Sequence, residues 1–171
     1  MTIEEQTEKL NFIIGRFDHF YDSINNKGNL YLTINTFLVA GSLAGYYSLN
    51  TVHHFSPWVW ILFFLPSISC NLISFAYTLS AIRPFTRKHS TTNSLIFFAD
   101  VTNLSEEQWM QSWNSLTEVS WNDDLKLQTH ILATGLNKKF ESLSCATIFI
   151  GLQVTIFFLF SVYYFLTFKI Q

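Results

Sequence analysis

The sequence predicts an all-α membrane protein with three transmembrane helices, a small cytoplasmic helical domain and an N-terminal amphipathic helix. Three apolar runs lead to this prediction, and they cover residues 30–49, 58–79 and 143–168. Each run has about 20 residues or more, enough for an α-helix to cross a hydrocarbon core of about 30 Å. None of the runs contains Asp, Glu, Lys or Arg. Charged residues make up only 13% of the 171-residue chain, about half the usual share in a soluble domain.

These spans divide the chain into four parts. Residues 1–28 are the N-terminal amphipathic helix, 29–80 a transmembrane hairpin, 81–141 a cytoplasmic helical segment, and 142–171 the third transmembrane helix, which continues the cytoplasmic helix. Neither segment outside the bilayer is long enough for a conventional catalytic domain, so no enzyme is expected. The net charge of −2 gives no preference for duplex nucleic acid.

The basic residues predict the orientation of the chain. Every Lys and Arg except Lys169 lies before the first run or between the second and third runs. Cytoplasmic loops collect these residues. The N-terminus and the central segment are therefore expected in the cytoplasm, and the C-terminus outside.

The N-terminal segment carries an apolar stripe at helical spacing. Two roles fit the stripe: packing on the rest of the cytoplasmic domain, or self-association at the centre of an oligomer, where it would act as a gate or plug. The candidate residues for the gate are Leu10, Ile13, Ile14, Phe17 and Tyr21.

The second run has two features that set it apart. Ser56-Pro57 predicts its start as an N-cap followed by proline, and Pro66 predicts a kink. A polar stripe then follows at helical spacing, and it must face protein or water because exposing it to lipid is costly. It can form hydrogen bonds between helices or line a pore. The pore-lining candidates, with one residue from the third run, are Ser67, Asn71, Ser74, Thr78 and Gln153.

Small residues in the spans predict close helix packing. Gly41 and Gly45 lie four residues apart in the first run, and Gly151 lies in the third. Glycines at this spacing allow two helices to approach closely within lipid.

The sequence of the central segment predicts helices. Ser105 and Gln108 form a capping-box pattern that opens a helix whose Trp109, Trp113 and Leu116 share one face. Asp123-Asp124 is expected to begin the last helix, because acidic residues favour the positive end of the helix dipole.

Basic residues flank this segment at both ends. They anchor it at the cytoplasmic membrane face or bind the phosphate of a nucleotide or lipid. The phosphate-binding candidates are Arg83, Arg87, Lys88, Lys138 and Lys139. The sequence has no phosphate-binding glycine loop and no Cys/His pattern with metal spacing, so no metal site and no resident cofactor are expected.

Short segments along the chain resemble a known family. They are residues 22–28 (DSINNKG) before the first span, 81–84 (AIRP) after the second, 94–101 (SLIFFADV), and 137–140 (NKKF) before the third. With this order of helices, the chain resembles the Pycsar transmembrane effectors of bacterial anti-phage defence and the related SLATT domains.

This resemblance implies a function. Such effectors are controlled by a nucleotide from a partner nucleotidyltransferase or cyclase, oligomerise, and breach the bacterial inner membrane, which depolarises the cell and arrests growth in abortive infection. A homotetramer is favoured on the same resemblance. The chain has no room for a separate cyclic-nucleotide domain, so an oligonucleotide is an alternative signal. A Hailong-type system, in which the enzyme's product restrains the channel, also fits a compact effector.

A second hypothesis needs no pore. A membrane adaptor could use its cytoplasmic helices to recruit a protein partner. Replacing Asn71 and Ser74 by Leu distinguishes the two hypotheses, because an adaptor tolerates the loss of the polar stripe and a channel does not.

Overall fold

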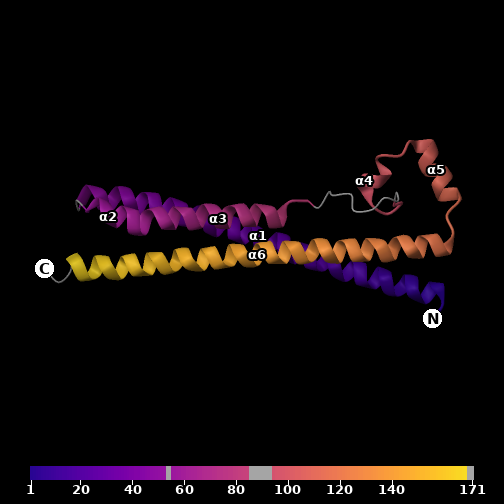
Figure 1. The fold of residues 1–171 in the computed structure, drawn as a ribbon, viewed down its shortest axis with the longest axis horizontal. Helices are drawn as coiled ribbons and strands as arrows, with labels where there is room; N and C mark the ends of the chain where they lie inside the picture. Colours follow the sequence, from indigo (N-terminus) through magenta and orange to yellow (C-terminus); the bar gives the residue numbers. More distant parts are fainter. Residues whose placement is uncertain (53–54, 85–93, 169–171) are drawn as a thin grey trace. The chain divides into compact units, whose positions relative to one another are not determined.

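The structure, a computed structural model, describes residues 1–52, 55–84 and 94–168. Of these residues, 89% are helical and none lies in a strand, which confirms the all-α prediction. The helices are α1 (Ile3–Val52), α2 (Pro57–Val59), the π-helix η1 (Trp60–Phe64), α3 (Leu65–Ile82), α4 (Phe98–Val101), α5 (Glu106–Asn114) and α6 (Glu118–Phe168) (Figure 1).

The chain forms two compact units, which we describe separately. The polar unit contains Met1–Ser23 and Pro84–Lys138, and the apolar unit contains Ile24–Arg83 and Lys139–Gln171. Helices α1 and α6 each continue from one unit into the other. The predicted amphipathic segment 1–28 therefore does not end before the first apolar run but belongs to the same helix.

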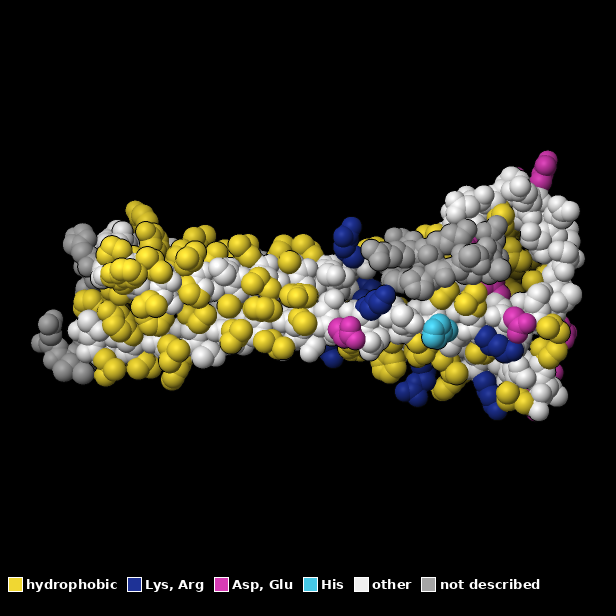
Figure 2. Space-filling view, viewed as in Figure 1, with side chains coloured by type: hydrophobic (Ala, Val, Ile, Leu, Met, Phe, Trp, Pro, Cys, Tyr) yellow, Lys and Arg dark blue, Asp and Glu magenta, His cyan; other side chains and the backbone are white. Residues whose placement is uncertain are grey.

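The apolar unit has its polar side chains inside and its apolar side chains outside. Phe37, Leu62 and Phe158 are 73%, 65% and 67% exposed, and hydrophobic side chains cover the visible face over α2, α3 and the C-terminal half of α6 (Figure 2). Half of the buried residues of this unit are Asn, Gln, Ser or Thr. Apolar surface on this scale marks contact with membrane or protein rather than with water.

Two helices are long and apolar enough to cross a membrane. They run from Pro57 to Ile82 and from Glu118 to Phe168, judged by length and composition. Residues 30–49 of α1 are not among these two helices, because Thr33, Asn35 and Thr36 lower the hydropathy of this segment. The third predicted span is therefore not shown by the structure.

The second run begins as predicted, with Ser56 at the N-cap position and Pro57 at the first helical position. Just before Pro66, the helix widens into the π-helical segment η1, in which the Leu65 N–H donates to the Trp60 carbonyl, five residues back. Pro66 has no N–H to donate to Leu62, and its ring clashes with that carbonyl in a regular α-helix. A wider turn is one way for a helix to accommodate such a residue.

Gly28 is where α1 and α3 approach most closely among the described glycines. A Cβ atom at this position would overlap the Ile82 side chain. Ile82 is β-branched and therefore stiff within a helix, so it has little freedom to move aside. Gly28 accordingly allows a contact that any larger residue would prevent.

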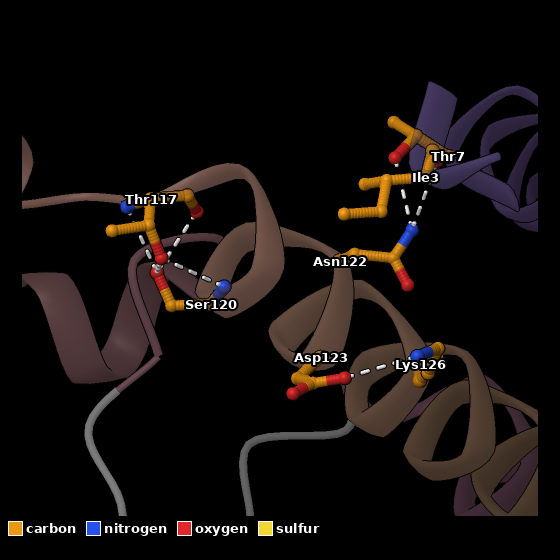
Figure 3. A network of polar contacts seen from close by, with 7 residues as sticks. All are labelled: Ile3, Thr7, Thr117, Ser120, Asn122, Asp123 and Lys126. Atoms are coloured by element: carbon orange, nitrogen blue, oxygen red, sulfur yellow. Dashed lines mark hydrogen bonds and ion pairs between the residues drawn. The ribbon is translucent and has the colours of Figure 1, made fainter.

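The polar unit differs from the sequence prediction in two places. The capping box of Ser105 and Gln108 is confirmed, but α5 ends at Asn114, so Leu116 lies beyond it. The last helix begins at Glu118 and not at Asp123-Asp124. Thr117 and Ser120 bond to each other's backbone N–H at this end (Figure 3), a capping arrangement that satisfies the free donors of the first turn.

We predict that Gly28→Ala destabilises the protein by about 1–3 kcal/mol, the usual cost of overpacking. Gly15→Ala in the same helix is the matched control. A Cβ at Gly15 meets nothing within 4 Å, so alanine should stabilise α1 by about 0.5–1 kcal/mol. Thermal unfolding in detergent measures both changes. Equal effects of the two substitutions would contradict the close contact at Gly28.

Candidate functional site

The centre of the apolar unit holds a cluster of buried polar side chains, which we call the polar core. Each of its side chains is 2% exposed or less. The polar core consists of Asn35 from α1, Ser67, Asn71, Ser74 and Thr78 from α3, and Gln153 from α6.

Asn71 links all three helices. Its side-chain amide nitrogen donates to the backbone carbonyl of Asn35 at 2.9 Å and to Gln153 Oε1 at 3.2 Å. Gln153 Nε2 in turn donates to Ser67 Oγ at 3.4 Å. One face of α3 is thereby connected to both neighbouring helices.

Ser74 forms a second set of contacts one turn further along α3. It accepts a hydrogen bond from Asn35 Nδ2 at 3.1 Å and donates to the Ala146 carbonyl of α6 at 3.2 Å. Thr78 instead donates within α3, to the Ser74 carbonyl at 2.9 Å. Thr78 therefore fills space in the polar core without joining two helices.

One acceptor of the polar core has no partner. Asn35 Oδ1 is buried and receives no hydrogen bond from the described residues. An unpaired buried polar atom costs about 1–3 kcal/mol, and the penalty is larger where no water is available. The unpaired oxygen of Asn35 therefore lowers the free energy of unfolding of the polar core.

Hydrogen bonds join three of the five pore-lining candidates directly, namely Ser67, Asn71 and Gln153, and Asn35 links Ser74 to Asn71. In this single chain Ser67, Asn71, Ser74 and Gln153 all form hydrogen bonds to a neighbouring helix. Lining of a pore stays a prediction. Asn35 was missed by sequence reasoning, although it is the most polar side chain of an otherwise apolar run.

Lys139 fixes the end of α3. The residue is 8% exposed, and its ammonium group donates to the carbonyls of Ala81 and Arg83. A cation at a helix C-terminus satisfies carbonyls that lack intrahelical partners and is attracted by the helix dipole. Burial lowers the pKa of Lys139 below its ordinary value.

A comparison with known proteins identifies the family. A model of the Pycsar effector protein domain matches residues 9–167. The chain belongs to the Pycsar effector transmembrane family. Membership implies a membrane effector in cyclic-nucleotide-signalled anti-phage defence and indicates a non-enzymatic one. The family and the two apolar helices together point to a membrane location. No curated protein and no solved structure matches this chain.

The basic candidates of this Pycsar effector do not have equal surroundings. Arg83 and Lys138 are exposed, whereas the Lys139 ammonium is engaged on backbone carbonyls. Arg87 and Lys88 lie outside the described residues. Phosphate binding by these residues stays a prediction, and within the described set Arg83 and Lys138 are the two best placed to meet a ligand.

The N-terminal stripe of the effector packs within the polar unit. Leu10, Ile14 and Phe17 are half-buried, while Ile13 is exposed. The Tyr21 hydroxyl donates to the Leu132 carbonyl of α6 at 2.9 Å, and burial, followed by the charge of Asp18, raises its pKa. A gating role of the stripe stays a prediction.

Asn122 ties the start of α1 to α6 in the same unit. Its amide nitrogen donates to Thr7 Oγ1 at 3.0 Å and to the Ile3 carbonyl at 3.4 Å (Figure 3). Asp123, the next residue, pairs with Lys126 on the exposed side of α6 at 3.0 Å. The first turn of α1 is therefore held by a specific side chain and not by apolar contact alone.

The three glycines predicted for helix packing make no close contact in this chain. A Cβ atom at Gly41, Gly45 or Gly151 would meet nothing within 4 Å. Close packing at these positions stays a prediction. Among the described residues, no group of three His, Cys, Asp or Glu side chains is placed to hold a metal ion.

We predict that Asn71 and Gln153 are energetically coupled. A double-mutant cycle with Asn71→Leu and Gln153→Leu should give about 0.6–1.7 kcal/mol, the range for hydrogen bonds between membrane helices. Unfolding in mixed micelles provides the four free energies. Asn71→Leu with Ser69→Ala is the control cycle, since Ser69 is exposed and bonds to Leu65 in its own helix. A coupling no larger than in the control would contradict the network.

We predict that Lys139→Met lowers stability by about 1.5–3 kcal/mol, because it removes charge-assisted hydrogen bonds to the end of α3. Lys138→Met is the matched control next to it, and as an exposed substitution it should stay within about 0.5 kcal/mol of wild type. The apparent melting temperature in detergent reports both. Similar losses in the two variants would show that Lys139 does not fix α3.

Proposed function

We propose that this Pycsar effector is an ion channel that opens under control of a nucleotide signal, depolarises the bacterial inner membrane and arrests growth. The observation that best supports this proposal is the polar core, in which amide and hydroxyl side chains are concentrated at the centre of a unit with an apolar exterior. Residues 30–49 of α1 form the third span in this proposal. The N-terminus and the central segment face the cytoplasm, and the C-terminus faces outward.

Three helices of one chain are too few to enclose a pore, so the channel is a homo-oligomer, with a tetramer favoured. A closed ring of identical subunits places the same face of each at the axis. We propose that the described arrangement is the resting one, in which polar side chains satisfy one another. Separation of α3 from its neighbours then turns Ser67, Asn71 and Ser74 toward water.

The energy needed for this change is within reach of a ligand. Five hydrogen bonds of the polar core join one helix to another. At the membrane average of about 0.6 kcal/mol each, they amount to about 3 kcal/mol. Ligands typically couple to distant sites with about 1–3 kcal/mol, and several subunits can each contribute one ligand. The signal must bind the two states with different affinity.

The nucleotide signal, from a partner cyclase or nucleotidyltransferase, is proposed to act on the polar unit. In that unit Lys138 is the described candidate for its phosphates, and Arg83 is the described candidate at the end of the apolar unit. The stripe that includes Leu10, Phe17 and Tyr21 is proposed to hold the resting state through its packing on α6. No resident cofactor or metal takes part.

The second candidate function is the membrane adaptor. The observation in its favour is that the polar core is closed within one chain, as hydrogen bonds that only hold helices together would be. An adaptor would recruit a protein partner through the polar unit and leave the membrane potential unchanged.

Cysteine accessibility distinguishes the two functions. In a chain with Cys70 and Cys145 replaced by serine, Ser74→Cys puts a small thiol in the buried core, and Ser69→Cys puts one on the apolar exterior of the same helix. Cells express each variant alone and then together with the partner cyclase or nucleotidyltransferase. A potential-sensitive dye reports depolarisation. A water-soluble thiosulfonate should modify Ser74→Cys only in depolarised cells.

The exterior cysteine variant is the control for this labelling experiment. Ser69→Cys should stay unmodified in both conditions, because its thiol faces hydrocarbon. Depolarisation without modification of Ser74→Cys would place the conducting path elsewhere. An unchanged membrane potential in every condition would favour the adaptor.

A further inference from the structure

A cavity of about 160 Å³ lies among the three helices of the apolar unit. It lies beside η1, which directly follows α2 in the chain. Its walls come from α1, η1 and α6, and they include Gly41, Gly45, Trp60, Phe64, Phe157 and Phe160. None of the polar-core residues lines the cavity.

Two independent features of the chain keep this space open. Gly41 and Gly45 present no side chain to it, and a Cβ at either position would meet nothing within 4 Å. The opposite wall is the π-helical segment, which contributes Trp60, Phe63 and Phe64. Single π-helical turns inside α-helices are rare and are frequent at functional sites.

Aromatic contacts hold the wall in place. The Tyr46 and Trp60 rings meet edge to face with centroids 4.3 Å apart, and the Tyr46 and Phe64 centroids are 5.0 Å apart. On the far side, Phe63 contacts Phe160 of α6 at 5.5 Å. These rings support one another from α1 to α6 and prevent the helices from closing over the glycines.

The chemistry of the lining excludes a polar ligand. The Ser42 hydroxyl on the wall donates to the Leu38 carbonyl of its own helix at 2.6 Å, and the rest of the lining is almost entirely apolar. A buried water needs two to four polar partners, whereas an apolar cavity of similar size, about 150 Å³, takes up benzene. The cavity therefore suits a few methylene groups.

We propose that the cavity binds the acyl chain of a membrane lipid. The occupant follows from the apolar exterior of the same helices. Leu43, Ile61 and Leu159 are the sequence neighbours of lining residues and are exposed, and such side chains meet hydrocarbon in a membrane protein. An empty apolar space leaves its walls without van der Waals partners, and an acyl chain entering from the adjacent lipid supplies them. The inference rests on the proposed three spans but not on ion conduction.

The test uses the full chain in dodecyl maltoside, titrated with phosphatidylcholine that carries bromine on its acyl chains. Bromine quenches tryptophan only at short range, and Trp60 lines the cavity. The difference in emission between Trp58→Phe and the Trp58→Phe/Trp60→Phe double variant isolates Trp60. A site should give quenching that saturates at low lipid fraction, above the linear rise caused by lipid in the micelle.

Filling the cavity provides the matched comparison. In the Trp58→Phe background, Gly45→Leu should remove the saturating component, with at least a fivefold loss of its amplitude. Gly151→Leu should retain it, since Gly151 also has open space beside it but does not line the cavity. A purely linear response of Trp58→Phe, or an unchanged saturating component in Gly45→Leu, would overturn the proposal.

Light scattering on the same samples checks the competing occupant. If Gly45→Leu reduces the molar mass of the oligomer and the parent chain shows no saturable quenching, a second copy of the chain fills the cavity, and the lipid proposal fails. None of these measurements depends on membrane potential. A failed channel proposal and a failed lipid site therefore give different results.

Discussion

The apolar unit depends on the hydrogen bonds that the side-chain amide of Asn71 donates. It donates to the Asn35 carbonyl of α1 and to the Gln153 side chain of α6, so one residue determines which face of α3 points inward. Water cannot replace these partners in hydrocarbon, and rotating α3 would expose Asn71, Ser67 and Ser74 to lipid. The apolar exterior follows from the same constraint, because the remaining faces of the helix carry leucine, isoleucine and phenylalanine.

Packing around this centre changes along the unit. At one end, α3 is held tightly: Gly28 lets α1 come against Ile82, and Lys139 of α6 bonds to the carbonyls of Ala81 and Arg83. At the other end, glycines on α1 and the π-helical turn leave a cavity. The polar core lies between the tight end and the open end. At the end with the cavity the helices meet through aromatic contacts, such as those of Tyr46 with Trp60 and of Phe63 with Phe160, and not through hydrogen bonds to the end of α3.

Much of the fold could be predicted from local patterns, and most of the site could not. The start of the second span, the Ser105 capping box and the polar stripe all depend on spacing within one helix, which a sequence shows directly. Asn35 could not be paired with Asn71 and Ser74, because their contact depends on the rotation of two helices. Lys139 resembled its neighbour Lys138 until the end of α3 was placed beside it. The start of α6 was misjudged because Asp123-Asp124 is a more conspicuous signal than Thr117 and Ser120.

In the proposed channel, the two interpretations of the polar stripe describe two states of the same residues. An apolar core would make separation of the helices costly, because every separated surface would face water without compensation. Amide and hydroxyl groups lose far less, since water replaces each hydrogen bond that is broken and the net value of such a bond is small. Asn35 Oδ1, which has no partner in the part of the chain that the structure describes, would gain one on hydration. A core built from Asn, Gln and Ser can therefore hold three helices together at rest and still allow them to part around a water-filled path.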